Sequence, residues 1–281
     1  MTKKFKIVTD SSVLLTPEEI TQYDIKIVPL TVELNGQTYR DGENISRADL
    51  LAALQNDQQP KTSQPALGSF VDTFTELTAD GSPVIAIVLS DHLSGTYASA
   101  QMAAEMVAGD ITIINSMNAD RGLAFQVLAA AQDAQAGKSL AEIKAHLQDV
   151  HERTLTDVFV AQMGSLVASG RISNFAGHIS KLLNIKLVTH LTDGKLSMIA
   201  KGRSNKTFYK RCQAIAEESK GREIAEIALS HVGCDEKYLT TLKEYLLSNQ
   251  DPNTPCSTEL TSSVIMSHVG LNGNGVTILY K

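Results

Sequence analysis

Short apolar runs alternate with amphipathic, capped stretches along the first half of the chain. The runs KFKIVTD, PVIAIVLS and DITIINS have the character of strands, and the stretches between them have helical spacing. Strands that alternate with helices in this way build a layered α/β domain. In open α/β sheets ligands bind beyond the carboxyl ends of the strands, so this alternation also limits where a site can form.

Local signals mark where the expected elements begin and turn. Capping boxes at Thr16–Glu19, Ser46–Asp49 and Ser139–Glu142 predict three helix starts, and Pro17 suits a first helical position. Asn-Gly at 35–36 and Asp-Gly at 193–194 each separate two extended runs. These two dipeptides predict β-hairpins.

The second half has a different order of expected elements, with a loop SGRIS, a helix GHISKLLN and a helix capped by Ser204. Its end, TSSVIMSHV and GVTILYK, predicts two closing strands. A chain of 281 residues is long enough for two cores, since domains commonly hold about 100 to 200 residues. We therefore expect two α/β domains, residues 1–153 and 154–281.

Charge and composition exclude several classes of protein. The net charge of -6 and the dispersed lysines and arginines argue against a nucleic-acid surface, which needs a clustered basic face. The N-terminus lacks the apolar stretch of a secretory signal, and no run approaches the roughly 20 apolar residues of a membrane span, so we expect a cytoplasmic protein. Cys212, Cys234 and Cys256 match neither a disulfide framework nor a zinc site.

Small hydroxyl and amide side chains gather in the loops that leave the expected strands or enter the next helices. Several precede helices, whose free N–H groups suit an anion, although serine and threonine there also serve as ordinary caps. Glycine between two hydroxyls at 94–96 permits close approach of the backbone to a ligand. The positions are Asp10-Ser11-Ser12, Thr62-Ser63, Ser90, Ser94-Gly95-Thr96 and Asn115-Ser116.

Several motifs of known binding and catalytic sites are missing from the sequence. The chain has no GxGxxG after its first strand, no GxxxxGK[ST] loop, and no HExxH, CxxC or EF-hand loop, which leaves dinucleotide, nucleotide and metal sites without support. The GxSxG elbow of a serine hydrolase is also missing. A looser triad of Ser94, with His92 or His268 as base and Asp10 as orienting group, stays open.

Arg171 and Arg203 could be solvated charges or could recognise an anion or an acidic partner.

Taken together and in order, segments across nearly the whole chain resemble the DegV family, which includes the fatty acid-binding subunits of bacterial fatty acid kinases. The most specific matches are TSQP and SGTY at their observed separation. The full set is IVTDSS, PLTVELNGQTYRDG, KTSQP, LSGTYASA, SGRIS, LLNIK, LTDGKL, KGRSNK and SHVG. The resemblance implies two α/β domains with a fatty acid bound between them.

Residue by residue, the resemblance implies a binding site for a carboxylate. Thr62 and Ser94 match the hydroxyls that bind the fatty acid head group, Gly95 and Thr96 would add donors at the helix start, and His268 matches a histidine near the head group. As further implications, Arg171 and Arg203 match arginines that dock the kinase partner.

The implied function is that of a carrier that is not itself an enzyme and has no cofactor or metal. It would hold a long-chain fatty acid in an apolar pocket that has uncharged hydrogen-bond donors at its rim. It would present the carboxylate to a separate ATP-dependent kinase, which forms an acyl phosphate. Two alternatives stay open: a serine-dependent acyl-ester or thioester hydrolase that uses Ser94, and a lipid sensor that controls a partner.

Overall fold

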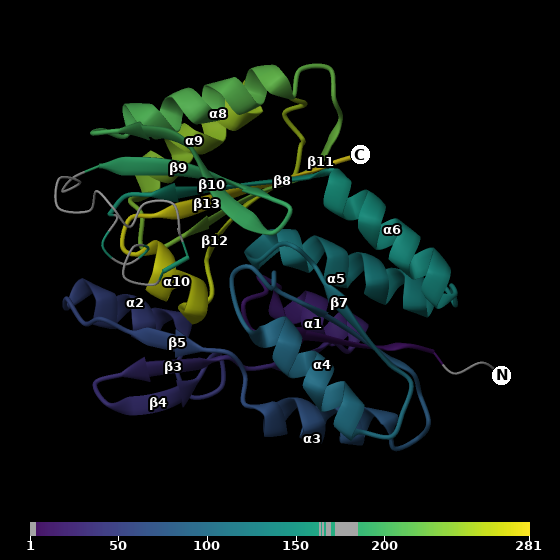
Figure 1. The fold of residues 1–281 in the computed structure, drawn as a ribbon. Coiled ribbons are helices and arrows are strands. Elements are labelled where there is room, and N and C mark those ends of the chain that lie inside the picture. Colours follow the sequence, from purple (N-terminus) through teal and green to yellow (C-terminus); the bar gives the residue numbers. More distant parts are fainter. Residues whose placement is uncertain (1–3, 163, 165, 167–169, 172–184) are drawn as a thin grey trace.

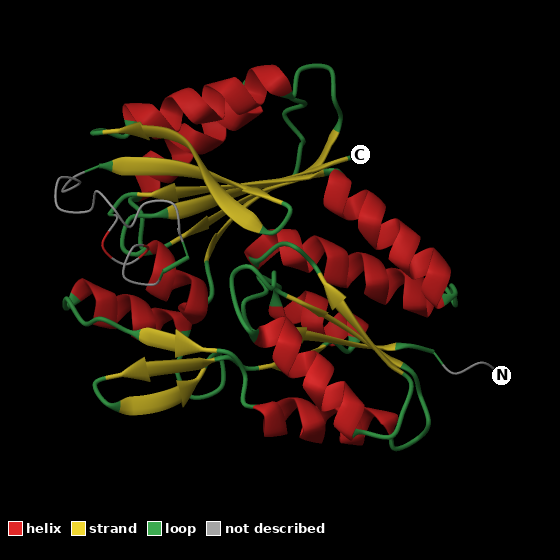
Figure 2. Cartoon of the chain, in the orientation of Figure 1, coloured by secondary structure: helices red, strands yellow, loops and turns green. Residues whose placement is uncertain are grey.

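The computed structural model describes residues 4–162, 164, 166, 170–171 and 185–281. Within these residues the strands form sheets of four, six and three strands, and helices cover or separate them (Figure 2). The α/β class predicted from the sequence is confirmed.

The four-stranded sheet is parallel, with the order β2-β1-β6-β7. Every residue of β6 is buried, because helices cover both faces of this sheet. Phe70 and Phe74 of α3 pack on one face together with α4, and α5 packs on the other. The elements are β1 Lys6–Asp10, α1 Pro17–Tyr23, β2 Lys26–Val28, α3 Leu67–Thr78, β6 Val84–Val88, α4 Thr96–Met106, β7 Ile111–Asn115, α5 Asp120–Gln135 and α6 Leu140–Glu152.

The six-stranded sheet is mixed, with the order β10-β9-β8-β13-β11-β12 and one parallel pair, β11 with β12. Helices α8 and α9 cover its outer face (Figure 1). The stacked rings of Phe159 and Phe208 lie in the core between the sheet and these helices. The elements are β8 Thr154–Val160, β9 Lys186–Thr192, β10 Lys195–Gly202, α8 Lys206–Glu218, β11 Ile224–His231, α9 Glu236–Leu247, β12 Cys256–Leu260, α10 Ser263–Val269 and β13 Asn274–Tyr280.

A small antiparallel sheet, β4-β3-β5, lies beside α2 (Figure 1). The expected hairpin is present: Asn35 and Gly36 both have positive φ, as the tight turn requires. The extended run IKIVPLTVEL divides at Pro29, so that its two parts join different sheets, and KTSQP, expected as a loop, supplies β5 by pairing with β3. The elements are β3 Thr31–Leu34, β4 Gln37–Arg40, α2 Arg47–Gln55 and β5 Lys61–Ser63.

The three helix starts predicted from capping boxes are confirmed, because Thr16, Ser46 and Ser139 each accept the expected backbone hydrogen bond. Two local predictions are wrong. TSSVIMSHV is not a strand but helix α10, because Ser262 Oγ accepts the Ile265 N–H and caps a helix there. The N-cap of α8 is Asn205 and not Ser204.

Helix α5 lies between the two large sheets, and this explains why nearly all of its side chains are buried. It packs on β1 and β6 of the first sheet and on β8, β11 and β13 of the second (Figure 1). The predicted boundary residue, Arg153, lies between α6 and β8, where the chain passes from one layer to the other. The division into two domains at this point stays a prediction. The expected helix GHISKLLN lies outside the described residues.

Arg121 of α5 ties the two halves together. Its guanidinium donates to Glu19 of α1 through two nitrogens, both at 2.8 Å, and to Glu226 of β11 at 2.7 and 3.1 Å. It also donates to the Leu14 carbonyl at 3.0 Å. Burial on its own would raise the pKa of Glu19, but the hydrogen bonds from Arg121 and the Thr16 N–H hold that pKa below its usual value.

Replacing Arg121 by methionine should lower the free energy of unfolding by about 2 to 4 kcal/mol, because two partly buried carboxylates lose their shared partner. Urea unfolding followed by circular dichroism measures this change. The matched control is Arg40→Met, which breaks the exposed pair with Glu43 and should change stability by less than about 1 kcal/mol. Equal effects of the two substitutions would contradict the bridging role.

Candidate functional site

A cavity lies between the two large sheets, and both halves of the chain line it. The space between its lining side chains is about 900 Å³, part of it open to solvent. The cavity is narrow, because little of this space is wide enough for a water molecule. Most of its surface is apolar. The apolar lining residues are Leu30, Leu89, Leu93, Ala119, Val158, Leu166, Leu191, Leu196, Val232, Val264, Ile265 and Val269.

The fold explains why these segments meet. The loops after β6 and before α5 leave the carboxyl side of the parallel sheet, where ligands of such sheets bind, and they bring in Leu89, Leu93 and Ala119. The opposite wall is the inner face of the six-stranded sheet, where alternate residues of a strand point the same way. Thr156 and Val158 of β8 reach the cavity by this alternation.

Thr62 and His268 meet on the cavity wall, although 206 positions separate them. Thr62 Oγ1 lies 2.7 Å from His268 Nε2. Burial lowers the pKa of His268 to about 3, with a further contribution from the positive charge of Arg171, so the imidazole is neutral at neutral pH. Its Nδ1 is buried and has no hydrogen-bond partner among the described residues. The resemblance therefore selected two residues that the structure places together.

Ser94 lines the cavity at the start of α4. Its Oγ lies 2.9 Å from Thr96 Oγ1 and accepts the Thr96 N–H at 3.3 Å. Thr96 is buried behind Ser94, and neither Thr96 nor Gly95 forms part of the cavity wall. A Cβ at Gly95 would meet the end of the Gln64 side chain, so the two residues lie in close contact. Head-group binding by Gly95 and Thr96 stays a prediction.

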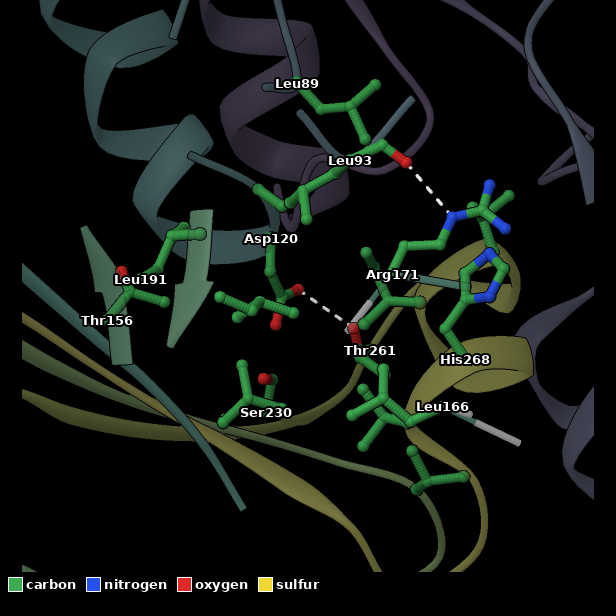
Figure 3. A pocket seen from close by; sticks show the side chains of 18 of the residues that line it. Leu89, Leu93, Asp120, Thr156, Leu166, Arg171, Leu191, Ser230, Thr261 and His268 are labelled. Carbon is green, nitrogen blue, oxygen red and sulfur yellow. Dashed lines mark hydrogen bonds between the residues drawn. The ribbon is translucent and has the colours of Figure 1, made fainter. Parts of the chain in front are cut away.

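The two arginines occupy different places. Arg171 lines the cavity and donates from Nε to the Leu93 carbonyl at 3.2 Å, beside His268 (Figure 3). A residue expected to meet a partner thus also faces the ligand space. Arg203 is exposed and lines a separate surface cleft together with Lys186 and Asn205. The docking role of both arginines stays a prediction.

Two charged side chains, Arg171 and Asp120, line the cavity, whose rim was expected to be uncharged. Asp120 was not among the residues predicted for the site. Asp120 is the first residue of α5, and its carboxylate accepts from Thr261 Oγ1 at 3.0 Å (Figure 3). Burial raises its pKa, against hydrogen bonds from Ser230 and Thr261. In the sequence, Asp120 has only the signal of an acidic residue in a first helical turn, which is common without function.

The other candidate loops do not reach the cavity with their hydroxyls. Ser11 Oγ donates to Asp41 at 2.9 Å, and Ser90 Oγ donates to the Gly194 carbonyl at 2.8 Å, joining the two halves. Ser116 Oγ donates to the Asn118 carbonyl within its own turn. Of the hydroxyl-rich loops, those with Thr62 and Ser94 therefore remain as candidate ligand contacts.

Asp10 holds part of the cavity wall in place. Its carboxylate accepts the Leu89 N–H at 2.7 Å and the Ser12 N–H at 2.9 Å, and the Leu89 side chain lines the cavity. The version of the triad with His268 is not assembled in this arrangement: Ser94 bonds Thr96, His268 bonds Thr62, and Asp10 bonds backbone amides. Catalysis by Ser94 would need its side chain and a histidine to rearrange.

The described part of the chain has neither a cluster of metal ligands nor a membrane-spanning helix. No group of three or more His, Cys, Asp or Glu side chains is arranged there to hold a metal ion. In the same residues, no helix combines the length and the apolar character needed to cross a bilayer.

Comparisons with known proteins agree with this architecture. The family model described as "Uncharacterised protein, DegV family" matches residues 4–281. A DegV domain-containing protein of Streptococcus pneumoniae is 38% identical over 99% of both chains. A DegV family protein from Thermus thermophilus, described by its fatty acid binding, has a TM-score of 0.87 at 28% identity, covering 99% of this chain and all of its own. DegV of Bacillus subtilis, a fatty acid binding protein, has a TM-score of 0.86 at 25% identity over the full length of both.

Replacing Asp10 by asparagine should change how stability depends on pH. Burial raises the pKa of Asp10 from 3.8 to about 6, against hydrogen bonds from Ser12 and Leu89, so the folded protein holds this proton more tightly than the unfolded chain. The contribution of Asp10 to stability therefore falls as pH rises from about 4 to about 6, by roughly 3 kcal/mol, and Asp10→Asn removes this fall. Urea unfolding of both proteins from pH 4 to pH 7 measures the difference.

Glu142→Gln provides a control of opposite sign. Hydrogen bonds from the Ser139 side chain and N–H lower the pKa of Glu142, so its contribution is present at neutral pH and is lost as pH falls. A difference between wild type and Asp10→Asn that does not vary with pH would contradict the raised pKa of Asp10.

Proposed function

The chain belongs to the DegV family, and from this premise we propose that it binds a long-chain fatty acid in the cavity between its two large sheets. The single observation that carries the proposal is the narrow, mostly apolar cavity whose wall holds Thr62, Ser94, Arg171 and His268 together. We call these four residues the head-group set. Relatives described as fatty acid-binding proteins share the fold over their full length.

The tail would supply most of the affinity. Burying about 14 methylenes at about 0.8 kcal/mol each gives on the order of 11 kcal/mol before ordering costs. The narrow cross-section favours an unbranched chain over a bulky ring system, because the space passes between side chains such as Leu89, Leu93 and Leu191. The ligand therefore needs length more than width.

The head-group set would fix the orientation of the acid. Thr62 and Ser94 carry hydroxyl donors, and the guanidinium of Arg171 gives this part of the cavity a positive charge that attracts a carboxylate. His268 is neutral there, so it can donate one hydrogen bond without adding a second charge. Asp120, elsewhere on the wall, would repel the carboxylate when ionised, which favours the same orientation.

The double substitution Thr62→Val, Ser94→Ala should weaken binding of a long-chain fatty acid about tenfold to a hundredfold, because two hydrogen bonds to a charged group are lost. Titration with a fluorescent acyl acid measures the affinity, and native mass spectrometry shows whether the purified protein already carries an acid. Thr241→Val, which removes an exposed hydroxyl on α9, is the control. The proposal fails if the wild-type protein binds no acid, and the site assignment fails if the double variant binds normally.

We further propose, from the family resemblance, that this protein acts in the cytoplasm and presents the bound carboxylate to a separate ATP-dependent kinase, which forms an acyl phosphate. The missing phosphate-binding loop supports a division of labour in which this chain binds no nucleotide. The exposed Arg203, with Lys186 in the same cleft, supplies positive charge for an acidic partner surface.

Arg203→Ala should lower acyl phosphate formation by a fatty acid kinase severalfold while fatty acid binding stays unchanged, because the side chain lies outside the cavity. Lys220→Ala removes an exposed charge near the other end of α8 and is the matched control. Kinase assays with the loaded protein, beside binding titrations, separate the two effects. Wild-type rates with Arg203→Ala would remove this residue from the docking surface.

The hydrolase alternative predicts a different result with the same protein. A chromogenic acyl ester would be turned over, and Ser94→Ala would abolish the turnover. A lipid sensor would bind the acid as proposed but would copurify with a regulated partner and not with a kinase.

A further inference from the structure

The cavity contains a second group of polar side chains, distinct from the head-group set. Asp120 is 7% exposed and accepts from Thr261 Oγ1 at 3.0 Å, and Ser230 is its other hydroxyl partner. All three residues line the cavity, and we call them the Asp120 set. Figure 3 shows the Asp120 carboxylate near Thr261 and Ser230, with Arg171 and His268 on another part of the wall.

The backbone holds Asp120 in this position. Its φ is 54°, in the left-handed region, and its N–H and carbonyl bond the Ser12 carbonyl and the Leu14 N–H of the first half. On the facing strand, Gly275 has no Cβ, and a Cβ there would collide with Ser230 Oγ and lie 3.5 Å from Asp120 Oδ2. Asp120 thus lies beside a position of the second half that has no side chain.

A plain alkyl chain suits this part of the wall poorly. It would displace water from the carboxyl and hydroxyl groups and return no hydrogen bond. A hydroxyl on the chain would return one, since it can both donate to the carboxyl and accept from it or from its neighbours. The raised pKa of Asp120, caused by burial, favours the neutral carboxyl, which also donates and accepts.

A carboxylate head group is the wrong occupant for the Asp120 set. It would face another acid, whereas the head-group set offers the positive charge of Arg171 and hydroxyl donors. The two groups on the wall therefore differ in the chemistry that they accept. One suits an anion, and the other suits a neutral group that forms hydrogen bonds.

We propose that the preferred ligand is a fatty acid with a hydroxyl group along its chain, which the Asp120 set binds while the head-group set holds the carboxylate. The inference rests on the proposed fatty acid binding and refines its ligand class. It assigns Asp120 as a residue that determines specificity.

The test compares stearic acid with isomers of hydroxystearic acid that carry the hydroxyl at different positions. At least one isomer should bind wild-type protein about fivefold or more tightly than stearic acid. Asp120→Gly removes the carboxyl without straining the left-handed backbone and should abolish this preference. Asp120→Asn keeps a donor and an acceptor and should retain it.

Thr62→Val separates this inference from the proposed function. It should weaken stearic and hydroxystearic acids alike and leave the ratio of their affinities unchanged. If wild-type protein binds stearic acid but prefers no hydroxylated isomer, the role of Asp120 is overturned and fatty acid binding stands. If it binds neither kind of acid, both proposals fail. The wild-type comparison decides the question even if Asp120→Gly does not fold.

Discussion

Helix α5 is buried between the two large sheets, and its packing determines how the two halves of the chain are arranged. A helix that packs on both sides needs small and apolar residues around most of its surface, and the alanine-rich run of α5 provides them. Its buried cation, Arg121, is accommodated because Glu19 and Glu226 both pair with the guanidinium. The same packing fixes how the sheets face each other, and the cavity lies just beyond the N-terminal end of this helix.

The distribution of charge in the cavity connects the fold to its ligand chemistry. A uniformly apolar slot would accept an acyl chain in either direction. Here Arg171 lies beside His268, and Asp120 lies with Thr261 and Ser230, so the wall differs along its length. Each polar group is positioned by contacts that link the two halves, and ligand orientation is therefore a property of their packing.

Local structure was largely readable from the residues, and errors arose where tertiary partners decided. Capping boxes and the Asn35-Gly36 turn act within a few residues, so their predictions held. KTSQP became a strand only because β3 lies beside it, and α10 formed where β-branched residues suggested a strand. Of the site, the family motifs selected Thr62, Ser94 and His268, and no local pattern identified Asp120.

The residues alone were enough to predict the α/β class, the starts of α1, α2 and α6, and the Asn35-Gly36 turn, because these depend on interactions between near neighbours in the chain. The contact of Thr62 with His268, and that of Asp120 with Thr261, 141 positions away, arise from the tertiary fold. Such contacts depend on how sheets and α5 pack, and packing sums many weak, long-range contacts that no short segment encodes.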